Sequence, residues 1–165
     1  MMKSSLVVYA LSDSYSELWP TLAAEVGLTL ERTSAPPTGA DPTSSVVLIA
    51  AGGEEAALPR AVRELRAGCD AALAVIASDA GHRLAASVVR AGADQLFVVP
   101  EDLDLLRSWL REAAERLLSR EDRRNFAAGE AAKYTFEGIL GASGSLAAAL
   151  ERVARVIPHS NVTVL

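Results

Sequence analysis

The stretch LAVIASDAGHRLAASVVRAGADQLFVVP, residues 73–100, contains the pattern that decides the fold. The apolar run 73–77 is typical of a buried parallel strand, and the segment after it has its apolar residues at helical spacing up to Gly92. A second apolar run, 95–99, follows and ends at Pro100. A strand, a helix and a strand in this order predict one right-handed crossover unit of a parallel sheet.

The same alternation extends towards the N-terminus. Short apolar runs predict three more strands, at residues 6–10, 28–32 and 45–50. Helical spacing predicts helices at residues 14–26 and 54–67, each stopped by a glycine. The Pro-rich segment 34–42 predicts a surface loop. Together these elements predict an α/β fold with a five-stranded parallel sheet in the flavodoxin-like order 2-1-3-4-5, with ligands at the carboxyl ends of the strands.

Length and composition limit the possible functions. The 165 residues are 50% hydrophobic and carry a net charge of −5, which suits one domain with a sizeable core plus a further segment. The acidic balance argues against direct DNA binding. The single cysteine, Cys69, excludes an internal disulfide, fits a reducing compartment and is expected in a loop or at a helix end. Because no apolar run approaches the length of about 18 residues of a membrane span, we expect a cytoplasmic protein without a membrane partner.

The last helix is longer than closure of the fold requires. Its apolar pattern begins after Asp102, and the helix can continue for about twice the usual four turns. Either all its apolar residues pack on the sheet, or some form the seam of a homodimer. We expect the dimer, because Leu105, Trp109 and Leu118 widen the apolar face beyond a single stripe. The expected seam consists of Leu103, Leu106, Leu110, Ala113 and Leu117.

The pattern around Gly92-Ala93, a strand and helix before it and a short strand with a proline after it, resembles the back half of a response-regulator receiver domain. In that family two acidic residues after the first strand bind a divalent cation, and an Asp ending the third strand accepts a phosphoryl group. A Thr or Ser ends the fourth strand and a Lys the fifth, and a short helix often stands in place of the loop 34–42. The resemblance implies that these functional places are occupied here by Ala10, Leu11, Ala50, Ala77 and Val99. Such side chains can neither hold Mg²⁺ nor neutralise phosphoryl charge.

Nearby polar residues offer few substitutes. Asp13 or Asp79 would supply an acid if the alignment were displaced by two residues, and the domain would then be a conventional phospho-acceptor receiver. Both acids, and Ser78, are instead expected to cap helices. His82 has no partner carboxylate in a recognisable arrangement, and Gly52-Gly53 is interpreted as a turn because the G-x-G-x-x-G fingerprint is absent. We therefore expect no catalytic residue, no metal site and no enzyme.

The C-terminal segment begins with FEGILGAS, residues 136–143, and ends with SNVTVL, residues 160–165. This order resembles the opening of the AAA+ ATPase domain of sigma-54-dependent, NtrC-type transcriptional activators. That family continues into a Gly-rich phosphate loop with a Lys, and this chain stops at Leu165, just before such a loop. The resemblance implies that Ile139, Leu140 and Gly141 lie beside the adenine of ATP. ATP and Mg²⁺ would belong to the complete ATPase, so no cofactor is expected within residues 1–165.

These patterns predict a degenerate receiver-like domain at 1–118, a helical linker at 119–134 and the start of an AAA+ domain at 135–165. The resemblance implies a phosphorylation-independent regulatory domain. It would control dimerisation and assembly of its own ATPase through the long helix, and the ATPase would act on sigma-54 RNA polymerase. One alternative is a small-molecule sensor that uses the emptied strand-end pocket. A small flavodoxin-like or Rossmann-like enzyme is disfavoured, because no catalytic side chains are found.

Overall fold

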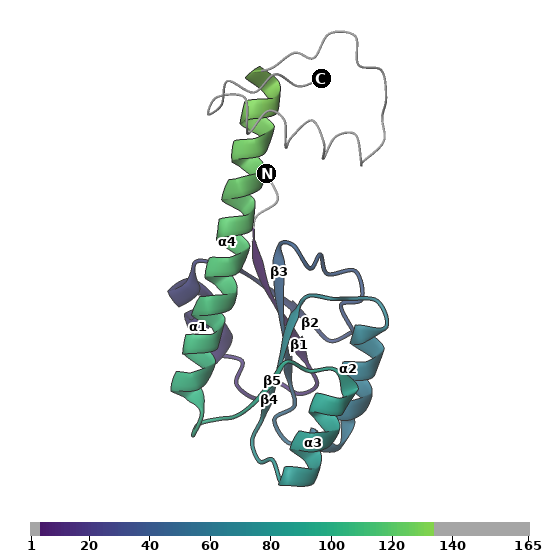
Figure 1. The fold of residues 1–165 in the computed structure, drawn as a ribbon. Helices are drawn as coiled ribbons and strands as arrows, with labels where there is room; N and C mark the ends of the chain where they lie inside the picture. The colour runs from purple at the N-terminus through teal and green to yellow at the C-terminus, as the bar shows by residue number, and fades with distance from the viewer. Residues whose placement is uncertain (1–3, 134–165) are drawn as a thin grey trace. The chain divides into compact units, whose positions relative to one another are not determined.

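The computed structural model describes residues 4–133, and its centre is a parallel sheet in the order β2-β1-β3-β4-β5 (Figure 1). The strands are β1 (Ser5–Ala10), β2 (Thr29–Thr33), β3 (Ser45–Ala50), β4 (Ala72–Ala77) and β5 (Gln95–Val98). The helical elements are α1 (Leu18–Val26), the 3₁₀ turn η1 (Glu55–Ala57), α2 (Leu58–Arg66), α3 (His82–Ala91) and α4 (Leu103–Lys133). The predicted fold class and strand order are confirmed.

Two hydrophobic cores lie on opposite faces of the sheet. Helix α1 and the first part of α4 cover one face, where Trp19 and Leu110 are fully buried. Helices α2 and α3 cover the other face, where Leu65 and Val88 are buried. All six residues of β3 are buried, and the five after Ser45 alternate between the two cores. This double burial is the reason why the central strands are continuous apolar runs rather than alternating ones.

Two helices begin later than their sequence patterns predict. Helix α1 begins at Leu18 rather than at residue 14, because Tyr15 has a φ of 63° and no right-handed helix can include that conformation. Helix α2 begins at Leu58 and is preceded by the separate turn η1. Pro59 lies in the first turn of α2, where its missing N–H leaves no helical hydrogen bond unmade.

The connection between β2 and β3, residues 34–44, is a series of turns without a helix, as predicted. The carboxylate of Asp41 accepts hydrogen bonds from the backbone N–H and the hydroxyl of Thr43, at 2.8 and 2.6 Å. The buried thiol of Cys69 donates to the carbonyl of Ala40 at 3.3 Å and accepts from the backbone N–H of Ala71 at 3.4 Å. Cys69 therefore holds this connection against the chain that enters β4.

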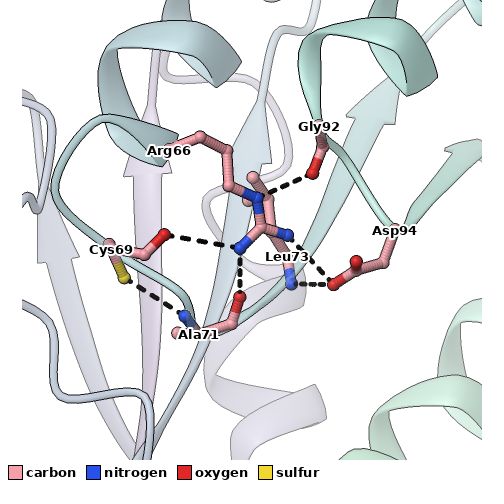
Figure 2. Close-up of polar contacts among 6 residues, drawn as sticks. All are labelled: Arg66, Cys69, Ala71, Leu73, Gly92 and Asp94. Carbon is pink, nitrogen blue, oxygen red and sulfur yellow. Dashed lines mark hydrogen bonds and ion pairs between the residues drawn. The ribbon is translucent and has the colours of Figure 1, made fainter.

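Arg66, at the end of α2, joins several chain segments beside the amino ends of β4 and β5 (Figure 2). Its Nε donates to the carbonyl of Gly92 at 2.7 Å, and its Nη1 donates to the carbonyl of Ala71 at 2.7 Å. Its Nη2 lies 3.1 Å from Oδ2 of Asp94, and the same oxygen accepts the backbone N–H of Leu73 at 2.8 Å. A Cβ on Gly92 would lie 2.9 Å from Cγ of Arg66, so this close approach requires glycine. One guanidinium thus connects α2, the end of α3 and the start of β4.

Helix α4 is continuous from Leu103 to Lys133, although the chain divides into two compact units between Leu118 and Ser119. In the first unit α4 packs on the same sheet face as α1. None of the helices within residues 4–133 combines the length and the apolar character that crossing a membrane requires.

Candidate functional site

The five positions that the sequence resemblance assigns to a receiver's phosphorylation site lie at the carboxyl edge of the sheet. Ala10 and Ala50 are paired at the ends of β1 and β3, and the backbone N–H of Leu11 donates to the carbonyl of Ala50 at 2.9 Å. The backbone N–H of Val99 donates to the carbonyl of Ala77 at 2.9 Å. The structure therefore brings the backbones of these residues together, but their side chains carry no group that can bind a metal ion or accept a phosphoryl group.

These five side chains do not line one open pocket. Ala50 and Val99 belong to the core under α1 and α4, with 1% and 6% exposure. Ala77 is fully buried in the opposite core, and Leu11 packs against that same core. The prediction of an emptied apolar pocket lined by all five residues is therefore wrong, because neighbouring strand-end residues alternate between the two faces of the sheet.

Two serines after β1 hold the turn that follows β3. The hydroxyls of Ser12 and Ser14 both donate to the carbonyl of Gly52, at 3.2 and 3.0 Å. Gly52 has a φ of 49°, and a Cβ there would collide with the side chains of both serines. Neither serine is among the residues predicted for the site. Gly52 is a turn residue, as expected, and its lack of a side chain is what allows the two loops to touch.

A carboxylate occupies the space between the loops that follow β3 and β4. One oxygen of Glu55, Oε1, accepts the hydroxyl of Ser78 at 2.6 Å and the backbone N–H of Ser78 at 3.0 Å. The same oxygen accepts the backbone N–H of Gly53 at 3.1 Å. The hydrogen bond from the Ser78 hydroxyl is the largest cause that lowers the pKa of Glu55 to about 2. Glu55 is thus ionised at neutral pH, and the hydrogen bonds that its carboxylate accepts connect the two loops.

The contact between Glu55 and Ser78 should make stability depend on pH. Because folding lowers the pKa of Glu55 from 4.5 to about 2, its contribution is present above pH 4.5 and is lost as pH falls towards 2. We expect Glu55→Gln to reduce the free energy of unfolding at neutral pH. The difference in this free energy between the variant and wild type should shrink as pH falls from 4.5 towards 2. Denaturant unfolding at a series of pH values measures this.

The matched control is Glu54→Gln, since Glu54 is exposed and precedes the same turn. This variant should follow the wild-type pH profile. A constant difference between wild type and Glu55→Gln down to pH 2 would contradict the assigned pKa.

Tyr15 closes the same edge of the sheet from the side of α1. Its ring stands edge-on to Trp19 with the ring centroids 6.1 Å apart, and it packs against the core under α1 and α4. Its hydroxyl reaches to 3.5 Å from the carbonyl of Val99, the residue after β5. The unusual backbone of Tyr15 therefore directs an aromatic side chain across the strand ends.

The other polar candidates do not form a site. Asp13 and Asp79 are exposed, and no group of three or more metal-ligating side chains gathers in the part of the chain that the structure describes. Neither α1 nor α3 has a side-chain cap, so the expectation that Asp13, Ser78 and Asp79 cap helices is wrong. His82 is exposed in the first turn of α3. Ser78 binds Glu55 instead of its own helix.

The side chains predicted to form a dimer seam are used within the domain. Four of the five are buried, namely Leu106, Leu110, Ala113 and Leu117, and Leu103 packs against the same core. The prediction that they form a free seam is wrong, because their stripe faces the sheet. The apolar residues of α4 that remain exposed in the first unit include Leu105, at 62%, and Leu118, at 42%. The predicted adenine-side residues Ile139, Leu140 and Gly141 lie outside the described residues.

No protein-family model matches the chain, and no curated protein matches it. Solved structures resemble it in fold. A two-component response regulator from Clostridium difficile has a TM-score of 0.58 at 8% identity, over 70% of this chain and 98% of that chain. A response regulator from Thermotoga maritima has a TM-score of 0.52 at 16% identity, over 68% and 98% of the two chains. A pilus assembly protein, CpaE, from Burkholderia thailandensis has a TM-score of 0.51 at 18% identity, with the same coverage.

These similarities show that the described domain has the receiver fold. They show the fold alone, because every identity is below 20% and the names of the matching proteins point to different cellular roles. The role of this chain therefore has to be argued from its own residues.

Proposed function

We propose that this chain carries a regulatory domain that works without aspartyl phosphorylation. The observation behind the proposal is the carboxyl edge of the sheet, where Ala10, Ala50 and Ala77 occupy the places of the acidic and hydroxyl groups of a receiver. The pair of Glu55 and Ser78 supports it further. Ser78 follows the switch position directly, and its hydroxyl is already bonded to a carboxylate of the same chain.

We also propose that the domain regulates an ATPase of the sigma-54 activator type. This part of the proposal rests on the resemblance of residues 136–165 to the start of such an ATPase. Helix α4 packs on the sheet through Leu106 and Leu110, and only two residues separate its last residue, Lys133, from that segment in sequence. A partner that binds two arrangements of α4 with different affinity would therefore shift the assembly of the ATPase.

Homodimerisation through α4 belongs to the same proposal, with the contact assigned to exposed residues. Leu105 is suited to a dimer contact because it is 62% exposed, whereas the apolar stripe beside it on the helix is buried in the core. The active oligomer would then bind sigma-54 RNA polymerase through the ATPase rather than through this domain.

Treatment with a small phosphoryl donor and Mg²⁺ should leave the protein unchanged. We expect no phosphoryl adduct in the intact mass and no change of oligomeric state by light scattering, because no carboxylate occupies the acceptor position at Ala50. A receiver domain with the complete acidic set serves as the positive control. An adduct that disappears in Asp13→Asn or Asp79→Asn would contradict the proposal and restore the conventional receiver.

Deletion of residues 1–118 from the natural protein tests the regulatory role directly. We expect transcription from a sigma-54 promoter to lose its normal regulation, since the domain that sets ATPase assembly has been removed. Unchanged output together with unchanged regulation would overturn this role. A loss of regulation without loss of ATPase activity is the result that the proposal requires.

A further inference from the structure

A single carboxylate oxygen connects the loops that follow β3 and β4. Oε1 of Glu55 accepts one hydrogen bond from the backbone N–H of Gly53 and two from Ser78. The backbone N–H of Ser78 lies at 3.0 Å and its hydroxyl at 2.6 Å. Three donors from two loops thus converge on one point, and the acceptor at that point belongs to the chain itself.

The loop that Glu55 holds determines where α3 begins. Residues 78–81 join β4 to α3, which starts at His82 without a side-chain cap. Packing fixes α3 less firmly than α2, because only the side chain of Val88 is buried in α3, whereas α2 buries four side chains. The position of α3 therefore depends strongly on the polar contacts at its two ends.

Residues at the two ends of α2 make these contacts. Glu55 belongs to η1, directly before α2, and holds the loop in front of α3. Arg66 is the last residue of α2, and its Nε donates to the carbonyl of Gly92, directly after α3, at 2.7 Å (Figure 2). The side chain of Arg66 is only 20% exposed, whereas Ser78 is exposed. The contact at the start of α3 is therefore the one that water reaches and that can open locally.

We propose that the carboxylate of Glu55 is a built-in anion that keeps the start of α3 in one position and thereby fixes the regulatory state of the domain. Phosphorylation can order a loop by adding acceptor oxygens for charge-assisted hydrogen bonds. Here a side chain supplies the acceptor, and the donors of Gly53 and Ser78 are already engaged. The inference rests on the proposed function, because it names what sets the state of that regulatory domain.

The first measurement is local opening of residues 78–81 in the full chain, followed by amide hydrogen exchange. We expect Glu55→Ala to speed exchange at Ser78 and Gly53 by at least about tenfold after correction for intrinsic rates, as for one lost charge-assisted hydrogen bond. The amides of β4 should keep their wild-type rates. Glu55→Asp keeps the charge but is one methylene shorter, so it should behave like Glu55→Ala.

The second measurement is transcription from a sigma-54 promoter with the natural protein. Glu55→Ala and Glu55→Asp should change its regulation in the same direction as deletion of residues 1–118. Ser78→Ala should have a smaller effect, because it keeps the backbone hydrogen bond to Glu55. The matched control is Glu54→Ala, which changes an exposed acid of the same turn and should leave regulation as in wild type.

The two measurements separate failure of this inference from failure of the proposed function. If the loop opens in Glu55→Ala but regulation stays as in wild type, while deletion of residues 1–118 abolishes it, the inference is overturned and the proposed function stands. Unchanged exchange at Ser78 and Gly53 in Glu55→Ala would overturn the inference at its structural step. If the deletion itself changes nothing, the proposed function fails and this inference fails with it.

Discussion

Arg66→Met is expected to lower the free energy of unfolding by about 2–4 kcal/mol, the range for loss of several buried charge-assisted hydrogen bonds. Methionine keeps the aliphatic part of the side chain but removes every donor. The carbonyls of Gly92 and Ala71 lose their bonds of 2.7 Å, and Asp94 loses its ion pair (Figure 2). Because the side chain of Arg66 is only 20% exposed, water replaces these bonds poorly. Denaturant unfolding monitored by tryptophan fluorescence measures the loss.

Two further variants make this prediction specific. Arg63→Met changes an exposed arginine of the same helix and should alter stability by no more than about 0.5 kcal/mol. Arg66→Lys keeps the charge but not the planar fork, so its stability should lie between those of wild type and Arg66→Met. Equal effects of Arg63→Met and Arg66→Met would show that the network around Arg66 contributes nothing beyond a surface charge.

Leu110→Ala is expected to cost about 2–5 kcal/mol of stability, as is usual when a buried leucine is truncated. Leu110 is fully buried and packs in the core that Trp19 shares. Removal of its branched end leaves a cavity between α4 and the sheet that the close-packed surroundings can only partly fill. The measurement is the midpoint and slope of a denaturation curve, compared with those of wild type.

The variant Leu105→Ala tests the exposed face of the same helix independently of its buried face. Leu105 is 62% exposed, so we expect a change in stability of no more than about 0.5 kcal/mol. If α4 forms the proposed dimer through this face, the same variant should lower the dimer fraction in light scattering. The opposite pattern, a stable but monomeric Leu110→Ala, would mean that the buried stripe is the seam after all.

The central strands could be predicted closely from the sequence, because their signal is local. The bounds of β3, Ser45–Ala50, agree with the predicted run, and the end of β1 at Ala10 was also predicted. A strand that is buried on both faces has to be apolar at every position, so it stands out in the sequence. The end of α3 at Gly92 could also be predicted from the sequence, because glycine commonly ends helices. The φ of Gly92 is 114°, a conformation that glycine adopts easily and that is strained for other residues.

The contacts at the strand ends could not be predicted, because their partners are far apart in sequence. Ser14 lies 38 residues from Gly52, and Glu55 lies 23 residues from Ser78. A serine beside a strand, or a glutamate early in a helix, is expected to cap its own helix on local grounds. Only the sheet register brings these loops together. The positive φ of Tyr15 could not be predicted either, because an aromatic residue gives no indication of such a backbone conformation.

The long helix shows a different limit of sequence patterns. Leu106, Leu110 and Leu117 recur at a spacing that fits a helix packed on its own sheet as well as one packed on a second helix. The spacing defines a stripe, but not the surface that covers it. The tertiary structure assigns the stripe to the sheet, where it packs in the core that α4 shares with α1.

The burial of Ala50 limits the chemistry that one substitution could introduce at this position. An aspartate at this position would stand in an apolar core with 1% exposure, where loss of hydration favours the protonated form of a carboxyl group. Introduction of a phosphate acceptor at this position would therefore need a strand end that is open to water, as well as the exchange of alanine for aspartate. The packing of this edge therefore opposes phosphate-acceptor chemistry at position 50, and a single substitution would not supply it.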